Sequence, residues 1–121
     1  MLDDLNIMVV EDEALLAVDL SMILEDEGAR VEGPCMSIDA ALARTATIDA
    51  AILDVDLHGE PVFPVADRLR AEGTPFVFHT GRADLDELRR RYGDDVAILS
   101  KPSMPQQVVR SLSRAVAELD G

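Results

Sequence analysis

Aromatic and basic residues are scarce in this chain of 121 residues. It has no Trp, one Tyr and three Phe, so Val, Leu, Ile and Ala must fill the core. Basic residues number 11 against 24 acidic ones, which gives a net charge of −13. Such a balance opposes attraction to nucleic acid or to an anionic membrane, because phosphate groups favour clustered Lys and Arg. We therefore expect no direct nucleic-acid binding and no membrane partner.

Cysteine and long apolar runs are also nearly absent. Cys35 is the only cysteine, so no internal disulfide can form, which fits a reducing cytoplasm. We expect its thiol to act as a small buried hydrophobe near a strand end. The N-terminal MLDDLNIMVV is acidic with too short an apolar stretch for a signal peptide, and no run approaches the roughly 20 apolar residues of a membrane span. A soluble, cytoplasmic protein is the expectation.

Strand-like and helix-like segments alternate from end to end, which predicts βαβ units and a parallel α/β sheet. Near-continuous apolar strands indicate a sheet covered on both faces. Residues 1–121 are expected to form one domain. The predicted strands cover 6–10, 30–33, 50–55, 75–79 and 96–100, and the predicted helices cover about 13–27, 37–46, 65–71, 84–92 and 103–119.

Local signals support several of these helices. Ser37 is suited to cap the second helix, and Ser103-Met104-Pro105-Gln106 has the form of a capping box that opens the fifth. The first helix is indicated by an apolar stripe that comprises Leu15, Val18, Met22 and Ile23.

Four apolar runs each end in a residue suited to phosphate or Mg²⁺ chemistry. In an open parallel α/β sheet, ligands bind outside the carboxyl ends of the strands, so these residues should converge on one spot. Three carboxylates, a hydroxyl and an ammonium together indicate a divalent cation and a phosphoryl group. In chain order the residues are Glu11-Asp12, Asp54, Thr80 and Lys101.

Asp54 is the candidate for the reacting group. It follows a buried strand, so its carboxylate should lie at the rim, partly screened from water. A carboxylate there can attack phosphorus if a cation offsets the repulsion between anions. The alternative is that Asp54 caps the following turn, which is common for Asp after a strand.

The acidic pair Glu11-Asp12 points to a cation. Adjacent acids repel each other, a cost usually tolerated only where a cation or a cap compensates. Mg²⁺ prefers oxygen ligands and takes one or two carboxylates, so Mg²⁺ is the predicted cofactor. Capping of the first helix by Asp12 is the alternative, and it is compatible with metal binding.

Lys101 and Thr80 supply the groups that would hold a phosphoryl group. Lys101 is the only lysine in the chain and offers a compact charge that can pair with a carboxylate at rest and with a phosphoryl oxygen afterwards. Thr80 offers a hydroxyl at the end of another strand, although an ordinary turn threonine is an equal alternative.

The acidic pair, Asp, Thr-Gly and Lys-Pro, each after its own strand and in this order, resemble the response-regulator receiver domain of two-component signalling. The resemblance covers essentially the whole chain. It implies a doubly wound, flavodoxin-like (βα)5 fold with sheet order 2-1-3-4-5. It further implies that Asp54 accepts a phosphoryl group from phosphohistidine on a histidine kinase or histidine phosphotransfer protein, and so switches the binding of a downstream protein.

The resemblance also implies roles for the other residues of the site. Asp12 and Asp54 would ligate Mg²⁺ directly, together with the backbone carbonyl of Asp56, while Glu11 would act mainly through water. Thr80 and Lys101 would hold the phosphoryl oxygens, and Thr80 would move to meet them on activation.

The chain departs from the family's pattern at three positions. Ile98, three before the lysine, stands where many receivers carry a Tyr or Phe switch residue, so an aromatic switch there does not carry over. His58 stands where a Pro is frequent, and the simplest interpretation is a solvated loop residue. Asp56 adds an acid beside the site, and we expect it to form an ion pair with Arg82 across the mouth; the alternative is that both side chains lie in solvent.

A stand-alone phosphoacceptor with slow self-dephosphorylation, rather than an enzyme with turnover, is the leading hypothesis, and a domain excised from a longer protein fits the same sequence. The runner-up is a Mg²⁺-dependent phosphatase of the haloacid-dehalogenase kind, because Asp54-Val55-Asp56 matches its nucleophile-x-acid pair. Three features count against this phosphatase: the Asp-x-Asp segment follows the third strand, position 58 is a histidine, and a cap domain is lacking. A structural adaptor that is never phosphorylated is a third possibility, against which Thr80 and Lys101 count.

A basic cluster interrupts the acidic surface. It comprises three consecutive arginines in the fourth predicted helix and two in the fifth. Exposed ion pairs on the helix surface are the favoured interpretation. A docking face is the alternative, since receivers typically signal through this side; the residues are Arg89, Arg90, Arg91, Arg110 and Arg114.

Overall fold

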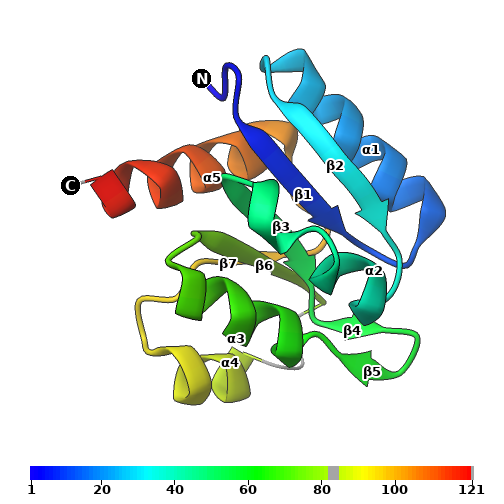
Figure 1. Cartoon of the computed structure of the whole chain (residues 1–121), viewed down its shortest axis with the longest axis vertical. Helices are drawn as coiled ribbons and strands as arrows, with labels where there is room; N and C mark the ends of the chain where they lie inside the picture. The colour runs from blue at the N-terminus through cyan, green and yellow to red at the C-terminus, as the bar shows by residue number, and fades with distance from the viewer. Residues whose placement is uncertain (82–84, 121) are drawn as a thin grey trace.

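A parallel sheet of five strands forms the middle layer of the molecule (Figure 1). The computed structural model describes residues 1–81 and 85–120, with side chains described as far as residue 118. The sheet has the order β2-β1-β3-β6-β7, and each neighbouring pair is parallel. The predicted order 2-1-3-4-5 is thus confirmed, because β6 and β7 are the fourth and fifth strands of this sheet in chain order. The strands are β1 (Asn6–Val10), β2 (Arg30–Cys35), β3 (Ala50–Asp54), β6 (Phe76–Thr80) and β7 (Ile98–Ser100).

Helices cover both faces of this sheet (Figure 1). Helices α1 (Ala14–Asp26) and α5 (Pro105–Asp120) pack on one face, while α2 (Ile38–Leu42), α3 (Phe63–Glu72) and α4 (Leu85–Tyr92) pack on the other. A short 3-10 turn, η1 (Thr45–Thr47), leads into β3. Among the described residues, no helix combines the length and the apolar character that a membrane span requires.

Alternation along the strands divides the core into two parts. On β1, Ile7 and Val9 pack towards α1 and α5, whereas Met8 and Val10 pack towards α2 and α3. The side-chain period of a strand is two. Continued to the ends of β3 and β6, this alternation puts Asp54 and its register partner His79 on the α1–α5 face, and Thr80 on the α3–α4 face.

A small hairpin follows β3 where the sequence predicted only a turn. Strands β4 (Asp56–Leu57) and β5 (Glu60–Pro61) pair in antiparallel fashion. The two residues between them, His58 and Gly59, have φ of 52° and 84°. Positive φ at both central residues is typical of a two-residue hairpin loop with a type I′ turn. The chain thus turns sharply directly after the rim of the sheet.

The apolar stripe predicted for the first helix does not face the core. Leu15 is 86% exposed, Val18 53% and Met22 57%, and of the four stripe residues only Ile23 packs against the core. The helix carries a second apolar row at the same spacing, and helical periodicity does not distinguish which row faces inwards. The residues of α1 that are buried are Ala17, Leu20 and Leu24.

The cap predicted for α2 is confirmed, whereas that for α5 is wrong. The Ser37 hydroxyl accepts a hydrogen bond of 3.1 Å from the Ala40 amide. At α5, the Ser103 hydroxyl instead donates to the Ser100 carbonyl at 2.6 Å. The amide of Met104 donates to the Gln107 side chain at 2.7 Å, so the reciprocal bond is one residue later than predicted. Cys35, as expected, is buried at the end of β2.

The burial of α1 predicts a contrast between two leucine substitutions. Leu24→Ala should lower the free energy of unfolding by roughly 2–5 kcal/mol, because it removes a fully buried side chain and leaves a cavity. Leu15→Ala should change it by less than about 0.5 kcal/mol, since that side chain is exposed. Urea denaturation followed by circular dichroism measures both. Equal losses would mean that the outer row of α1 packs on protein.

Candidate functional site

Three carboxylates from two adjacent strands meet at the carboxyl end of the sheet. Val10 and Leu53 are register partners, so the residues that follow them lie side by side. One oxygen each from Glu11, Asp12 and Asp54 lies within 4.8 Å of the others. The structure therefore brings together the acidic residues that the sequence singled out.

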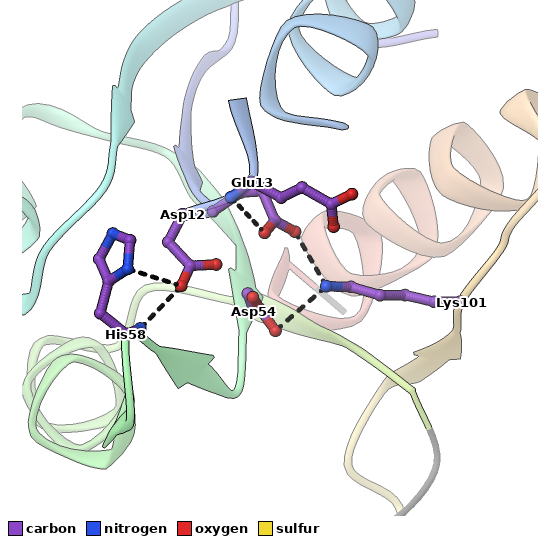
Figure 2. A network of polar contacts seen from close by, with 6 residues as sticks. Asp12, Glu13, Asp54, His58 and Lys101 are labelled. Carbon is purple, nitrogen blue, oxygen red and sulfur yellow. Dashed lines mark hydrogen bonds and ion pairs between the residues drawn. The ribbon is translucent and has the colours of Figure 1, made fainter. Parts of the chain in front are cut away.

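Lys101 joins this group from the other side. Its Nζ lies 3.1 Å from Oε1 of Glu11 and 3.3 Å from Oδ1 of Asp54. Figure 2 shows the lysine and Asp54 pointing towards each other. Glu11 is only 1% exposed and Asp54 8%, whereas Lys101 is half-buried. One ammonium thus compensates two carboxylates that are largely withdrawn from water.

Burial and neighbouring charge shift the pKa values of this trio. Burial first, and then the charge of Glu11, raise the pKa of Asp54 to about 7, while Lys101 acts in the opposite direction. Burial would lower the pKa of Lys101, but the nearby carboxylates of Glu11 and Asp54 outweigh burial and raise that pKa. The lysine therefore stays charged at neutral pH, whereas Asp54 is poised between its two protonation states.

One oxygen of Glu11 has spare bonding capacity. Oε2 accepts a hydrogen bond of 3.0 Å from the Glu13 amide. Within the described part of the chain, Oε1 has no aligned hydrogen bond, although Lys101 lies 3.1 Å away. That contact is thus an ion pair whose angles are poor for a hydrogen bond. A buried carboxylate oxygen in this state can still accept a water molecule or approach a cation.

Asp12 is oriented by the hairpin and does not cap α1. Its Oδ2 accepts a 2.7 Å hydrogen bond from the His58 amide, and Nδ1 of the same histidine lies 3.5 Å away (Figure 2). Burial alone would raise the pKa of Asp12, but hydrogen bonds and the nearby histidine outweigh it and lower that pKa. Helix α1 starts at Ala14, and within the described residues the preceding Glu13 makes no side-chain cap. The capping alternative for Asp12 is therefore wrong.

The sequence suggested that His58 is only a solvated loop residue, but the structure gives it a further role. Its ring is exposed, but its backbone, held at positive φ, presents an amide to Asp12. The signal that could have revealed this is the dipeptide His58-Gly59, because histidine and glycine both tolerate the conformation that the hairpin loop requires.

The remaining predicted residues lie around this centre. Thr80 is buried at the end of β6, and its carbonyl accepts a 2.7 Å hydrogen bond from the Lys101 amide, which ties the ends of β6 and β7 together. Asp56 is exposed at the start of β4, two residues beyond Asp54. The predicted ion pair of Asp56 with Arg82 lies outside the described residues, because Arg82 is not among them.

Aromatic residues cluster behind β7, although none occupies position 98. Ile98 packs against the core shared with α3 and α4. The ring of Tyr92, the last residue of α4, lies 5.3 Å from that of Phe78 and 6.3 Å from that of Phe63. Its hydroxyl donates to Asp67 on α3 at 2.7 Å, so Tyr92 fastens α4 to α3. The sequence does not single out this tyrosine, because periodicity alone does not distinguish it from any core residue.

Among the residues that the structure describes, ion pairs account for only part of the predicted basic cluster. Arg91 lies 3.5 Å from Glu87 one turn earlier, and its guanidinium stacks 3.9 Å above the ring of Phe63. Arg70 covers one side of Tyr92 at 5.8 Å. Arg91 is therefore a packing residue as well as a charge. Arg89 and Arg90 are exposed.

The donor set of the acidic group fits a hard divalent cation. It offers carboxylate oxygens alone, which suit Mg²⁺ rather than a softer metal. Three carboxylates face the single ammonium of Lys101 here, which leaves excess negative charge at this point. A cation bound there would relieve that excess, so the residues present fit the predicted Mg²⁺.

Comparison with solved structures identifies receiver domains as the structural neighbours. A response regulator receiver protein from Sinorhizobium medicae WSM419 is 27% identical, with a TM-score of 0.86 over 98% of this chain and 99% of that one. A CheY-like receiver domain protein from Methanospirillum hungatei JF-1 is 22% identical, with a TM-score of 0.84 and 98% of both chains covered.

The response regulator PhyR from Brucella abortus gives 24% identity and a TM-score of 0.80 over 97% of this chain. The chain spans about half of PhyR, since it covers 49% of that protein. No protein-family model and no curated protein matches the sequence. The chain thus has the fold of response-regulator receiver domains, including receivers that are stand-alone proteins.

The raised pKa of Asp54 predicts that Asp54→Asn stabilises the protein at high pH. The folded carboxyl holds its proton up to about pH 7, whereas the unfolded one loses it near 3.8, so stability falls as pH rises between these values. In metal-free buffer at pH 8 the variant should gain roughly 1–4 kcal/mol in free energy of unfolding, since each pH unit of that interval is worth about 1.4 kcal/mol. Urea denaturation at pH 4 should show little gain. A gain that is equal at both pH values would contradict the shift.

Proposed function

We propose that the chain is a phosphoacceptor receiver domain of a two-component phosphorelay, and that Asp54 is the residue that receives the phosphoryl group. The observation that carries the proposal is the position of Asp54, which lies at the rim of a receiver-type sheet, 3.3 Å from Lys101 and beside the acids that follow β1. A carboxylate held in this way is a nucleophile next to a positive charge that can bind the incoming oxygens.

The transfer itself would exchange one phosphorus bond for another. A carboxylate oxygen of Asp54 attacks the phosphorus atom of a phosphohistidine, the O–P bond forms, and the P–N bond breaks. The departing imidazole keeps the electron pair and takes up a proton. The donor is therefore a histidine kinase or a histidine phosphotransfer protein, and we propose a cytoplasmic location for the encounter.

Mg²⁺ is part of this proposal. Asp12 and Asp54 would hold the ion together with the backbone carbonyl of Asp56, and Glu11 would act through a water molecule. When bound, the ion would offset the repulsion between carboxylate and phosphoryl oxygens. The hairpin contributes by orienting Asp12, since the His58 amide holds one of its oxygens in place.

Lys101 and Thr80 would respond to a phosphoryl group on Asp54. In the structure Lys101 is paired with Glu11 and Asp54, and a phosphoryl group on Asp54 would offer it a new partner at short range. Thr80 would supply a hydroxyl from the next strand. Because the Lys101 amide is bonded to the Thr80 carbonyl, a shift of either residue is transmitted to the other. The result proposed is switched binding of a downstream protein.

Intact-mass spectrometry after incubation with acetyl phosphate and Mg²⁺ tests the proposal. The native chain should gain the mass of one phosphoryl group, and Asp54→Asn should gain none, because an amide cannot act as the nucleophile. Circular dichroism confirms that the variant is folded. Steady release of phosphate from p-nitrophenyl phosphate would instead favour the phosphatase of the haloacid-dehalogenase kind. A native chain that neither gains the phosphoryl mass nor releases phosphate would contradict both functions.

Titration calorimetry tests the metal site. Asp12→Ala should weaken Mg²⁺ binding at least about tenfold, the loss that even an indirect metal partner commonly produces. Asp19→Ala is the matched control, because it removes the same charge from an exposed position on α1 and should leave the affinity almost unchanged. Equal weakening in both variants would show that overall charge, not ligation by Asp12, sets the affinity.

A further inference from the structure

The β4–β5 hairpin contacts the acidic site through a residue of its loop. The His58 amide donates a 2.7 Å hydrogen bond to Oδ2 of Asp12, and Nδ1 of the same histidine lies 3.5 Å from that oxygen (Figure 2). The Asp12 side chain is 20% exposed, whereas that of His58 is 69% exposed. The more buried partner of this contact is thus a predicted metal ligand, and the exposed partner is the first residue of the hairpin loop.

The main-chain amide of His58 is a stronger donor to Asp12 than its ring. A length of 2.7 Å is that of a charge-assisted hydrogen bond, whereas a ring nitrogen at 3.5 Å makes a weak contact. The amide reaches Asp12 because the backbone of His58 has a φ of 52°. Position 58 therefore acts on Asp12 through the backbone, and any residue that keeps this amide and this conformation should act in the same way.

The hairpin holds this amide in place because its base is built into the core. Val55 and Leu57 are 4% and 2% exposed, and Val62, directly after β5, is buried. The Val62 amide donates to the Val55 carbonyl at 2.8 Å, which closes the base of the hairpin. The position of the His58 amide is therefore determined by core packing and by the conformation of the turn.

We propose that the β4–β5 hairpin sets the Mg²⁺ affinity of the acidic site, with His58 as a positioning residue that acts through its main-chain amide. Carboxylates that ligate a metal are themselves held by hydrogen bonds from outer groups, and loss of such a partner typically costs roughly 10–100-fold in affinity. The amide of His58 stands in this relation to Asp12. The inference rests on the proposed Mg²⁺ site and adds to it a residue that does not itself bind the ion.

Hairpin conformation and metal binding are then linked in both directions. If Mg²⁺ binds more tightly to the conformation in which the amide is bonded to Asp12, bound Mg²⁺ must favour that conformation by the same factor. The hairpin should therefore open less often when the ion is present. Exchange of the His58 amide hydrogen with water reports this local opening.

Two substitutions at position 58 separate the amide from the ring. His58→Pro removes both the ring and the N–H, and its φ of about −65° excludes the observed turn. His58→Gly removes the ring, but it keeps the N–H and readily adopts positive φ. In titration calorimetry His58→Pro should bind Mg²⁺ at least about tenfold more weakly than the native chain, and His58→Gly should stay within about twofold. Equal affinities in all three chains, or equal weakening in both variants, would overturn the assignment.

Gly73→Ala is the matched control for a perturbed turn. Gly73 follows α3 with a φ of 75°, and a Cβ added there would meet no described atom within 4 Å, so the substitution strains the backbone without a clash. The urea midpoint should fall in both Gly73→Ala and His58→Pro, but the Mg²⁺ affinity should fall only in His58→Pro. A loss of affinity in Gly73→Ala as large as that in His58→Pro would indicate general destabilisation and overturn the proposal.

The native chain provides a second test that needs no substitution. In hydrogen exchange followed by NMR, the His58 amide should exchange at least about tenfold more slowly with saturating Mg²⁺ than in metal-free buffer, because the linkage is reciprocal. The Gly73 amide, which donates to the Arg70 carbonyl at 3.2 Å, is the internal control and should keep its rate. An unchanged rate at His58 in a chain that binds Mg²⁺ would overturn the positioning role alone. A native chain without saturable Mg²⁺ binding would overturn the proposed metal site, and this inference with it.

Discussion

The ion pair of Lys101 with two buried carboxylates is the interaction on which the end of the sheet depends. Glu11 follows β1, Asp54 ends β3 and Lys101 follows β7, so one ammonium connects three strands. Removal of the ammonium would leave two like charges in a medium of low polarity, which is far more costly than the loss of an exposed pair. The same charge that compensates Asp54 at rest would be available to an incoming anion.

The fold and the meeting point of the acidic residues followed from the sequence, because both rest on strong local patterns. Apolar runs of three or four residues mark the buried strands, and the carboxyl ends of these strands must share one edge of a parallel sheet. The sequence did not predict which side of α1 packs on the core, since Leu15 and Leu20 belong to apolar rows of equal periodicity. Only contact with β1 and α5, which is tertiary, decides between these rows.

The details of the site depended on backbone conformation rather than residue type. The orientation of Asp12 is set by the amide of His58, which reaches it only because the hairpin loop adopts positive φ. The position of Tyr92 among Phe63, Phe76 and Phe78 requires the packing of α3 and α4 over β6. Both contacts join residues more than ten positions apart, which periodicity and turn signals do not report.

The alternation of side chains at the rim has a consequence for communication across the molecule. Asp54 and His79 lie on the face covered by α1 and α5, whereas Thr80, one residue further on, lies on the face covered by α3 and α4. A chemical event at the edge of the sheet is therefore adjacent to two surfaces that have no helix in common. A substitution on one of these surfaces would therefore leave the other surface unchanged.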